Sequence, residues 1–158
     1  MQLGITYSIN KNRTGRIKLL TISLAQYFTT KPHDSKQEDA AQELLTSVMG
    51  LLNYLVETKK IEFPTCPNTG TLISGSRGGS GDGGFRLPTA TTGASLSSHK
   101  EGKGIDIYDP RNKLDTLITN DPSLLVLFDL YRETPDATIT WCHLTTRAPK
   151  SKARTFLI

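Results

Sequence analysis

The stretch SSHKEGKGIDIY, residues 97–108, runs from a polar loop through two closely spaced glycines into a short β-type segment. His99 stands near its start, and Asp106 follows seven residues later, between Ile105 and Ile107. Because successive side chains of a strand point to opposite faces, the Asp106 carboxylate should face away from both isoleucines. A loop that turns back into this strand brings His99 within reach of the carboxylate, and the glycines permit the close backbone approach that the turn requires.

A second motif, Trp141-Cys142-His143, lies in a run rich in β-branched and aromatic residues, which predicts a strand over 138–144. On that strand Trp141 and His143 point to one face, so that the indole forms an apolar wall beside the imidazole. Cys142 points to the other face; it could ligate a metal by its chemistry, but the alternation favours a small buried residue. The third histidine, His33, belongs to neither motif and is expected at the surface.

Two imidazoles and one carboxylate can hold a single metal ion. Taken alone, however, the His99–Asp106 spacing is more typical of a surface aspartate on a half-exposed strand. The second motif is what makes a shared metal site the better interpretation.

A long amphipathic helix is predicted upstream of these motifs. Ser35 and Glu38 have the spacing of a capping box, in which each side chain satisfies the backbone N–H of the other residue. The residues that follow are apolar at intervals of three and four, which predicts a helix of about twenty residues with one buried stripe. Residues 17–28 predict a strand followed by a short helix.

The remaining elements alternate between strands and helices. Residues 71–74 predict a short strand. Two Asp-Pro pairs, each a capping side chain before a proline, predict helices over 110–119 and 122–132. Residues 154–158 are expected to close the sheet as a last strand. The sequence therefore predicts a small α+β domain.

The glycine-rich stretch GSRGGSGDGG, residues 75–84, invites comparison with a phosphate-binding loop. No Gly-Lys-Ser/Thr follows it, and no helix is predicted directly behind it. We interpret it as a mobile loop beside a site.

The length of 158 residues corresponds to one domain, which we place at residues 17–158 after an N-terminal extension at 1–16. The N-terminus lacks the apolar segment of a signal peptide, and no apolar run approaches the length of a membrane span, so we expect synthesis in the cytoplasm and no membrane partner. Cys66 and Cys142 are the only cysteines, which argues against a disulfide framework or a cysteine-rich zinc site.

The net charge is +4, with the basic residues concentrated toward both ends of the chain. This bias is explained by ordinary surface charge, by binding to an anionic polymer such as a bacterial wall, or by nucleic-acid binding. Nucleic acid is the weakest of the three, because no aromatic residues are interleaved with the basic ones and no binding motif is recognisable.

The two motifs together resemble a known signature. Ser97-x-His99-x-x-Gly102-x-Gly104-x-Asp106 followed by Trp141-x-His143 is similar to the pattern of the zinc D-Ala-D-Ala carboxypeptidase family, which includes peptidase endolysins of bacteriophages. Upstream, Ile73-Ser74-Gly75-Ser76-Arg77 resembles the family's Ser-Gly-Tyr-Arg segment, with serine in the tyrosine's place. The order agrees from about residue 24 to residue 147, and the C-terminal tail is similar in style to peptidase-like proteins encoded in phage genomes.

The resemblance implies an antiparallel sheet that carries the metal, with helices packed on its back. It implies one Zn²⁺ per chain held by His99, Asp106 and His143, with water in an open fourth position. Arg77 would hold a carboxylate or carbonyl of the substrate, and the Ser97 hydroxyl would support the ligands or touch the substrate. The implied substrate is a peptide of bacterial peptidoglycan, at the cell wall or through a virion.

One departure from the family pattern concerns proton transfer. Members usually place Glu, Asp or His a few residues before the last metal histidine, where this chain has Thr-Ile-Thr at 138–140. The nearest candidates are Glu133 and Asp136, which could also lie in an ordinary solvated turn. Two functions therefore remain open, an active zinc peptidase of the wall and a catalytically weak or inactive peptidase-fold component of a phage particle that contacts other virion proteins. A DNA-binding protein is a third reading, which rests on charge alone.

Overall fold

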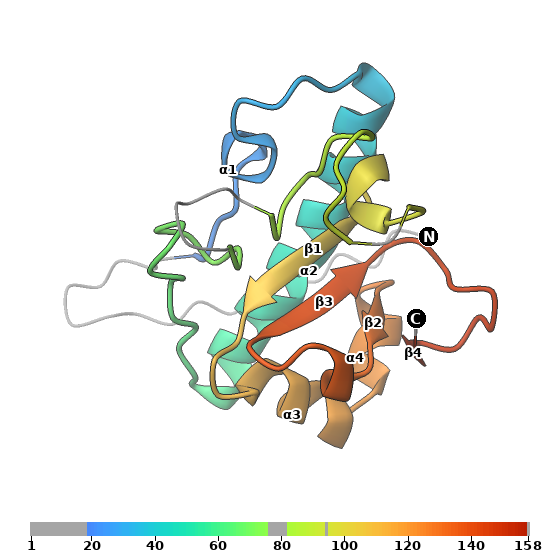
Figure 1. The fold of residues 1–158 in the computed structure, drawn as a ribbon. Coiled ribbons are helices and arrows are strands. Elements are labelled where there is room, and N and C mark those ends of the chain that lie inside the picture. The colour runs from blue at the N-terminus through green and yellow to red at the C-terminus, as the bar shows by residue number, and fades with distance from the viewer. Residues whose placement is uncertain (1–18, 76–81, 94, 158) are drawn as a thin grey trace, which may run out of the picture.

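The computed structural model describes residues 19–75, 82–93 and 95–157. Their core is a mixed four-stranded sheet with the order β1-β3-β2-β4, surrounded by helices (Figure 1). Its strands are β1 (Gly104–Tyr108), β2 (Tyr131–Glu133), β3 (Trp141–Thr145) and β4 (Thr155–Phe156). β3 pairs antiparallel with β1 and β2, whereas β4 runs parallel to β2. The α+β class is confirmed, but the expected antiparallel sheet has one parallel edge.

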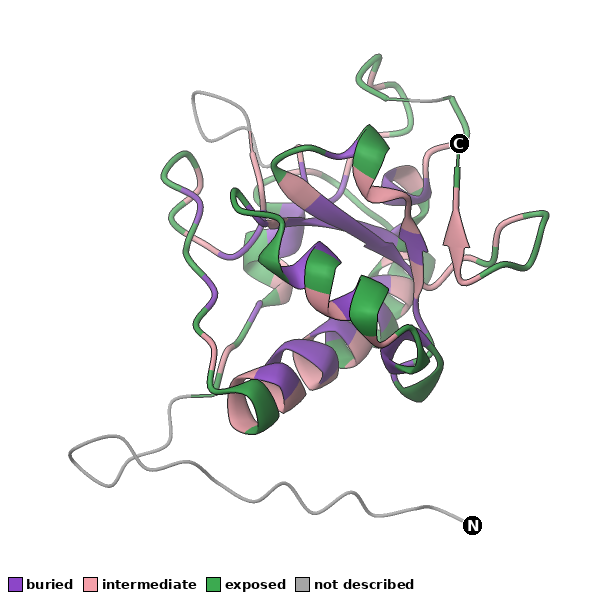
Figure 2. Ribbon diagram, turned by 90° about the horizontal axis from the view of Figure 1, so that it is seen from below, coloured by how far each residue is buried: buried purple, intermediate pink, exposed green. Residues whose placement is uncertain are grey.

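The long helix α2 (Ser35–Lys59) passes behind the sheet (Figure 1). Its buried side chains form one stripe, as the sequence predicts, and Figure 2 shows this stripe on the side facing the strands. The stripe consists of Ala41, Leu44, Leu45, Val48, Leu51, Leu52 and Leu55. These side chains share one hydrophobic core with Ile105, Ile107 and Leu144 of the sheet.

The predicted capping box is wrong by one residue. Asp34 is the N-cap: its carboxylate accepts the N–H of Gln37, and the Gln37 side chain in turn accepts the N–H of Asp34. Ser35 is the first helical residue, and Glu38 instead lies 3.6 Å from the imidazole of His33. The cap at Asp34 is accompanied by a tertiary contact, because the Gln37 side-chain amide also donates to the carbonyl of Lys100 at 3.0 Å.

The shorter helices are α1 (Leu24–Phe28), α3 (Lys113–Asn120) and α4 (Ser123–Leu127), with 3₁₀ turns η1 (Ser98–Glu101) and η2 (Pro135–Ala137). The predicted helix over 122–132 is wrong beyond residue 127. There Phe128 ends the helix, and Asp129 takes a positive φ of 50°, which turns the chain out of it. The chain then enters β2, so Glu133 stands on a strand.

The start of α3 also differs from the prediction. The helix begins at Lys113 rather than directly after the first Asp-Pro pair. The Asp109 carboxylate still caps it from a short distance upstream, because it accepts the N–H groups of Lys113 and Asp115.

Several strands are shorter than expected. β3 begins at Trp141 rather than at 138, and the segment 71–74 contributes a single antiparallel bridge between Ile73 and Ile107. Residues 19–22 form no strand, whereas the helix expected after them is present as α1. The N-terminal extension at 1–16 and Arg77 in the glycine-rich loop lie outside the described residues.

The two faces of the sheet have different chemistry. Ile105, Ile107 and Cys142 are fully buried on the face that packs against the helices. Asp106 and His143 therefore point to the opposite face, as the alternation predicts. Cys142 is a buried free thiol, which confirms its interpretation as a small core residue. Within the described ranges, no helix is both long and apolar enough to cross a membrane.

The observed cap predicts a contrast between neighbouring residues. Replacing Asp34 by Ala should lower the free energy of unfolding by about 0.5–2 kcal/mol, because the Gln37 N–H loses its acceptor. Ser35→Ala should change it by less than about 0.5 kcal/mol, because this exposed hydroxyl caps nothing. Urea unfolding measures both. A larger loss in the Ser35 variant would favour the capping box predicted from the sequence.

Candidate metal centre

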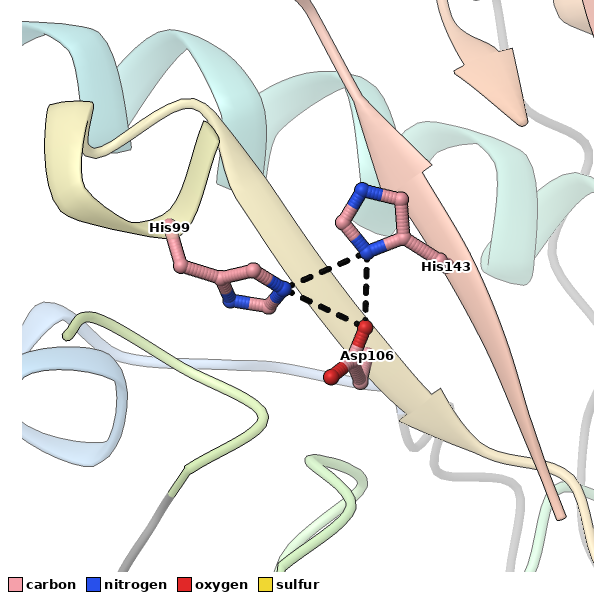
Figure 3. A group of neighbouring side chains, drawn as sticks. All are labelled: His99, Asp106 and His143. Atoms are coloured by element: carbon pink, nitrogen blue, oxygen red, sulfur yellow. Dashed lines mark hydrogen bonds and ion pairs between the residues drawn. The ribbon is translucent and has the colours of Figure 1, made fainter. Parts of the chain in front are cut away.

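Three buried side chains converge on the face of the sheet opposite Ile105 and Ile107 (Figure 3). The β1–β3 register sets Asp106 directly opposite His143. The Asp106 Oδ1 atom lies 2.7 Å from His143 Nδ1 and 3.3 Å from His99 Nε2, and the two ring nitrogens are 3.2 Å apart. The three residues that the sequence proposed as ligands therefore form one cluster.

His99 reaches this cluster through a tight turn. Ser97 is the N-cap of η1, and its hydroxyl accepts the His99 backbone N–H at 3.4 Å. Gly102 ends η1 in the left-handed region, with φ 76°, and an added Cβ would lie 2.5 Å from the Gln37 carbonyl oxygen. At Gly104 a Cβ would lie 2.2 Å from the Ser98 hydroxyl. The expected role of both glycines in the return of the chain is confirmed.

Each cluster residue also has a partner on its outer side. His99 Nδ1 lies 2.7 Å from the Gly84 carbonyl oxygen. Because a carbonyl can only accept, the proton sits on Nδ1, and Nε2 presents a lone pair to the cluster. His143 Nε2 lies 3.3 Å from the buried Ser98 hydroxyl, and Asp106 Oδ2 lies 3.1 Å from an Arg86 nitrogen. Such outer partners fix the orientation of metal ligands in known sites.

Two of the three distances between the inward atoms match the spacing that a metal ion requires. A tetrahedral ion with bonds of about 2.0–2.1 Å separates its ligand atoms by about 3.3–3.4 Å. The distances of 3.2 and 3.3 Å from His99 Nε2 agree with this value. The 2.7 Å between His143 and Asp106 is instead that of a direct hydrogen bond. The cluster could thus bind one metal ion after a small opening of this pair.

The protonation states also suit metal binding. Burial raises the pKa of Asp106, but the adjacent His99 and His143 outweigh it and hold that pKa well below its usual range. Burial lowers the pKa of His99, with Asp106 acting in the opposite direction. An ionised carboxylate and a neutral imidazole are the forms that bind metals.

Glu133 and Asp136, the two proton-transfer candidates, lie in different environments. Continuing the β2–β3 register by one residue sets half-buried Glu133 across from His143, on the cluster's face of the sheet. Burial raises the pKa of Glu133, His143 lowers it and Asp106 raises it further. Asp136 is exposed on η2, and among the described residues no hydrogen bond or ion pair joins it to the cluster. Of the two, Glu133 is therefore the one that lies on the cluster's face of the sheet.

Three contributors were not foreseen from the sequence. The Gly84 carbonyl comes from the last residue of the glycine-rich stretch, the Arg86 side chain from just after it, and the Ser98 hydroxyl from the motif itself. Arg86 is the only basic residue between Arg77 and His99, which is a weak signal. The Gly84 contact is made by a backbone carbonyl, so no residue type in the sequence indicates it. Of the expected substrate contacts, Ser97 is placed as the cap of η1, and Arg77 lies outside the described residues.

No protein-family model, curated protein or solved structure matches this chain. The buried cluster of His99, Asp106 and His143, which could hold a metal ion, is therefore the main structural evidence on function.

The cluster predicts metal-dependent stability. Added Zn²⁺ should raise the thermal unfolding temperature, because an ion that binds only the folded state stabilises it by about 2.7 kcal/mol at a hundredfold excess over Kd. His99→Ala and His143→Ala should abolish this rise. His33→Ala is the matched control, since His33 is an exposed histidine that stacks on Phe28 and does not belong to the cluster. An equal rise in all three variants would remove these histidines from the metal site.

Proposed function

We propose that this protein is a zinc-dependent peptidase that hydrolyses peptide bonds of bacterial peptidoglycan. The observation that carries the proposal is the convergence of His99 Nε2, His143 Nδ1 and Asp106 Oδ1, each with an outer partner. The resemblance of the two motifs to zinc D-Ala-D-Ala carboxypeptidases and phage endolysins supplies the reaction and the substrate class.

The donor set supports a catalytic metal rather than a structural one. Structural zinc sites are closed by four protein ligands, whereas catalytic sites keep three and leave a position open. Two imidazoles and one carboxylate also hold non-haem ferrous iron. The motif resemblance favours zinc, and elemental analysis distinguishes the two metals. Calcium fits poorly, because it prefers six to eight oxygen ligands.

The chain's own residues would position the substrate and move the proton. When bound, zinc would polarise the scissile carbonyl and lower the pKa of a water molecule to about 7. The Glu133 carboxylate would take a proton from that water and pass it to the leaving amine, a role that its raised pKa suits. Arg77 would hold a substrate carboxylate through the two-pronged hydrogen bond that a lysine cannot form.

A second candidate function is a metal-stabilised component of a phage particle that has lost catalysis. The observation in its favour is the Thr-Ile-Thr stretch at 138–140, where the resembling enzymes carry their proton-transfer residue. In this case the cluster would hold the fold together, and the partners would be other virion proteins. The position of Glu133 favours the enzyme, because a carboxylate from β2 can replace the one missing from the segment before β3.

Zinc content and murein digestion together test the proposal. The purified protein should carry about one zinc per chain and reduce the turbidity of purified murein. Glu133→Gln should lower kcat by about 10²–10⁴-fold while zinc remains bound, because only proton transfer is lost. Asp136→Asn is the matched control and should keep most of the activity.

The pattern of results separates the candidates. Bound zinc with intact murein in the wild type would favour the structural component. An active enzyme in which Asp136→Asn is the damaging change would move proton transfer to η2. Stoichiometric iron without zinc would contradict the peptidase assignment.

A further inference from the structure

Arg86 contacts the outer side of the cluster from a segment that neither motif contains. One of its terminal nitrogens lies 3.1 Å from Asp106 Oδ2, and the two side chains are 14% and 9% exposed. Its Nε donates to the Asp82 carbonyl at 2.7 Å, and its backbone N–H donates to the His99 carbonyl at 3.3 Å. The guanidinium thus joins the end of the glycine-rich loop to the Asp106 carboxylate, while the backbone joins the same segment to η1.

The carboxylate of Asp106 is divided between two partners. Oδ1 faces both histidines, and Oδ2 faces the guanidinium. An oxygen that accepts a charge-assisted hydrogen bond from arginine is held away from an ion on the other side. We propose that Arg86 is a positioning residue that makes Asp106 a one-oxygen metal ligand. This inference rests on the metal site of the proposed function and adds to it a determinant of affinity and coordination number.

The guanidinium is itself held in place. Gly93 has a φ of 78°, and a Cβ built there would lie 2.4 Å from Arg86 Nη1, so its backbone packs closely against the guanidinium. On the other side, the Gly83 carbonyl accepts the Asp106 backbone N–H at 2.7 Å, and a Cβ at Gly83 would lie 2.1 Å from the Ser74 carbonyl oxygen. The segment 82–86 therefore supports Asp106 through backbone and side chain, and His99 through the Gly84 carbonyl.

Arg86 should affect a bound ion in two opposing ways. Whether its removal tightens or weakens metal binding therefore shows which effect is larger. Its positive charge repels a cation, so loss of the charge alone would tighten metal binding. Its hydrogen bond orders the carboxylate, so loss of the bond would weaken binding, typically by 10–100-fold for partners of metal ligands. Because the charge of Arg86 is already paired with that of Asp106, we expect the loss of the hydrogen bond to outweigh the loss of the charge, and metal binding to weaken.

The test compares the full-length wild type with Arg86→Ala, Arg86→Lys and Arg111→Ala. Arg111 is exposed and serves as the control for loss of one positive charge. Zinc affinity is measured by competition with a chromophoric chelator. The visible absorption of the Co²⁺-loaded protein reports coordination geometry, since four-coordinate Co²⁺ absorbs more strongly than higher-coordinate Co²⁺. Methylguanidinium is then added to Arg86→Ala to refill the vacated space.

The proposal predicts that Arg86→Ala weakens zinc binding by about 10–100-fold. Its Co²⁺ band should also weaken, because the freed carboxylate binds through both oxygens, and methylguanidinium should restore both properties. Arg86→Lys should lie between the wild type and Arg86→Ala, because its ammonium cannot bond to Asp82 and Asp106 in the same planar arrangement. Arg111→Ala should match the wild type.

Unchanged or tighter zinc binding with an unchanged Co²⁺ spectrum in Arg86→Ala would overturn the positioning role. If that variant does not fold, Arg86→Lys decides by the same two measurements. A wild type that binds no metal would instead overturn the proposed function itself, and the role of Arg86 with it.

Discussion

The site depends on one cross-strand pair, Asp106 on β1 opposite His143 on β3. Their side chains meet at 2.7 Å only because both strands present their polar residues to the same face at the same register position. A slip of one residue in the pairing would turn His143 into the core and bring Cys142 to the cluster. The apolar alternation of β3 prevents this slip, because the slipped strand would move the fully buried side chains of Leu144 and Cys142 out of the hydrophobic core.

The same sheet also sets the position of Glu133. β2 is anchored from behind by buried Arg132, which donates to the Asp115 carbonyl at 2.7 Å and approaches the Asp115 carboxylate at 3.2 Å. On its outer edge β2 pairs with β4, where Arg132 lies opposite Thr155. Arg132, on the face that packs against the helices, and Glu133, on the cluster's face, are adjacent residues of β2. The buried network of Arg132 therefore bears on the geometry of the proposed reaction, although it lies on the face of the sheet opposite the cluster.

Much of the cluster could be predicted from the sequence because its determinants are local. The position of Asp106 between two isoleucines sets its face, the glycines at 102 and 104 permit the return of the chain, and the alternation at 141–143 separates the imidazole from the thiol. The apolar spacing of α2 was equally sufficient for its buried stripe. What could not be predicted depends on tertiary contacts. The cap of α2 lies at Asp34, where Gln37 also bonds to the carbonyl of Lys100, and the turn at Asp129 converts a predicted helix into β2.

We propose that one ion binds between His99 Nε2, His143 Nδ1 and Asp106 Oδ1. The most direct measurement is anomalous diffraction at the zinc absorption edge from a crystal of the zinc-loaded protein. We expect a single strong peak within about 2.0–2.2 Å of these three atoms, with His99 Nδ1 still bonded to the Gly84 carbonyl. A peak elsewhere, or a zinc ion bound through the outer nitrogen of either histidine, would contradict it.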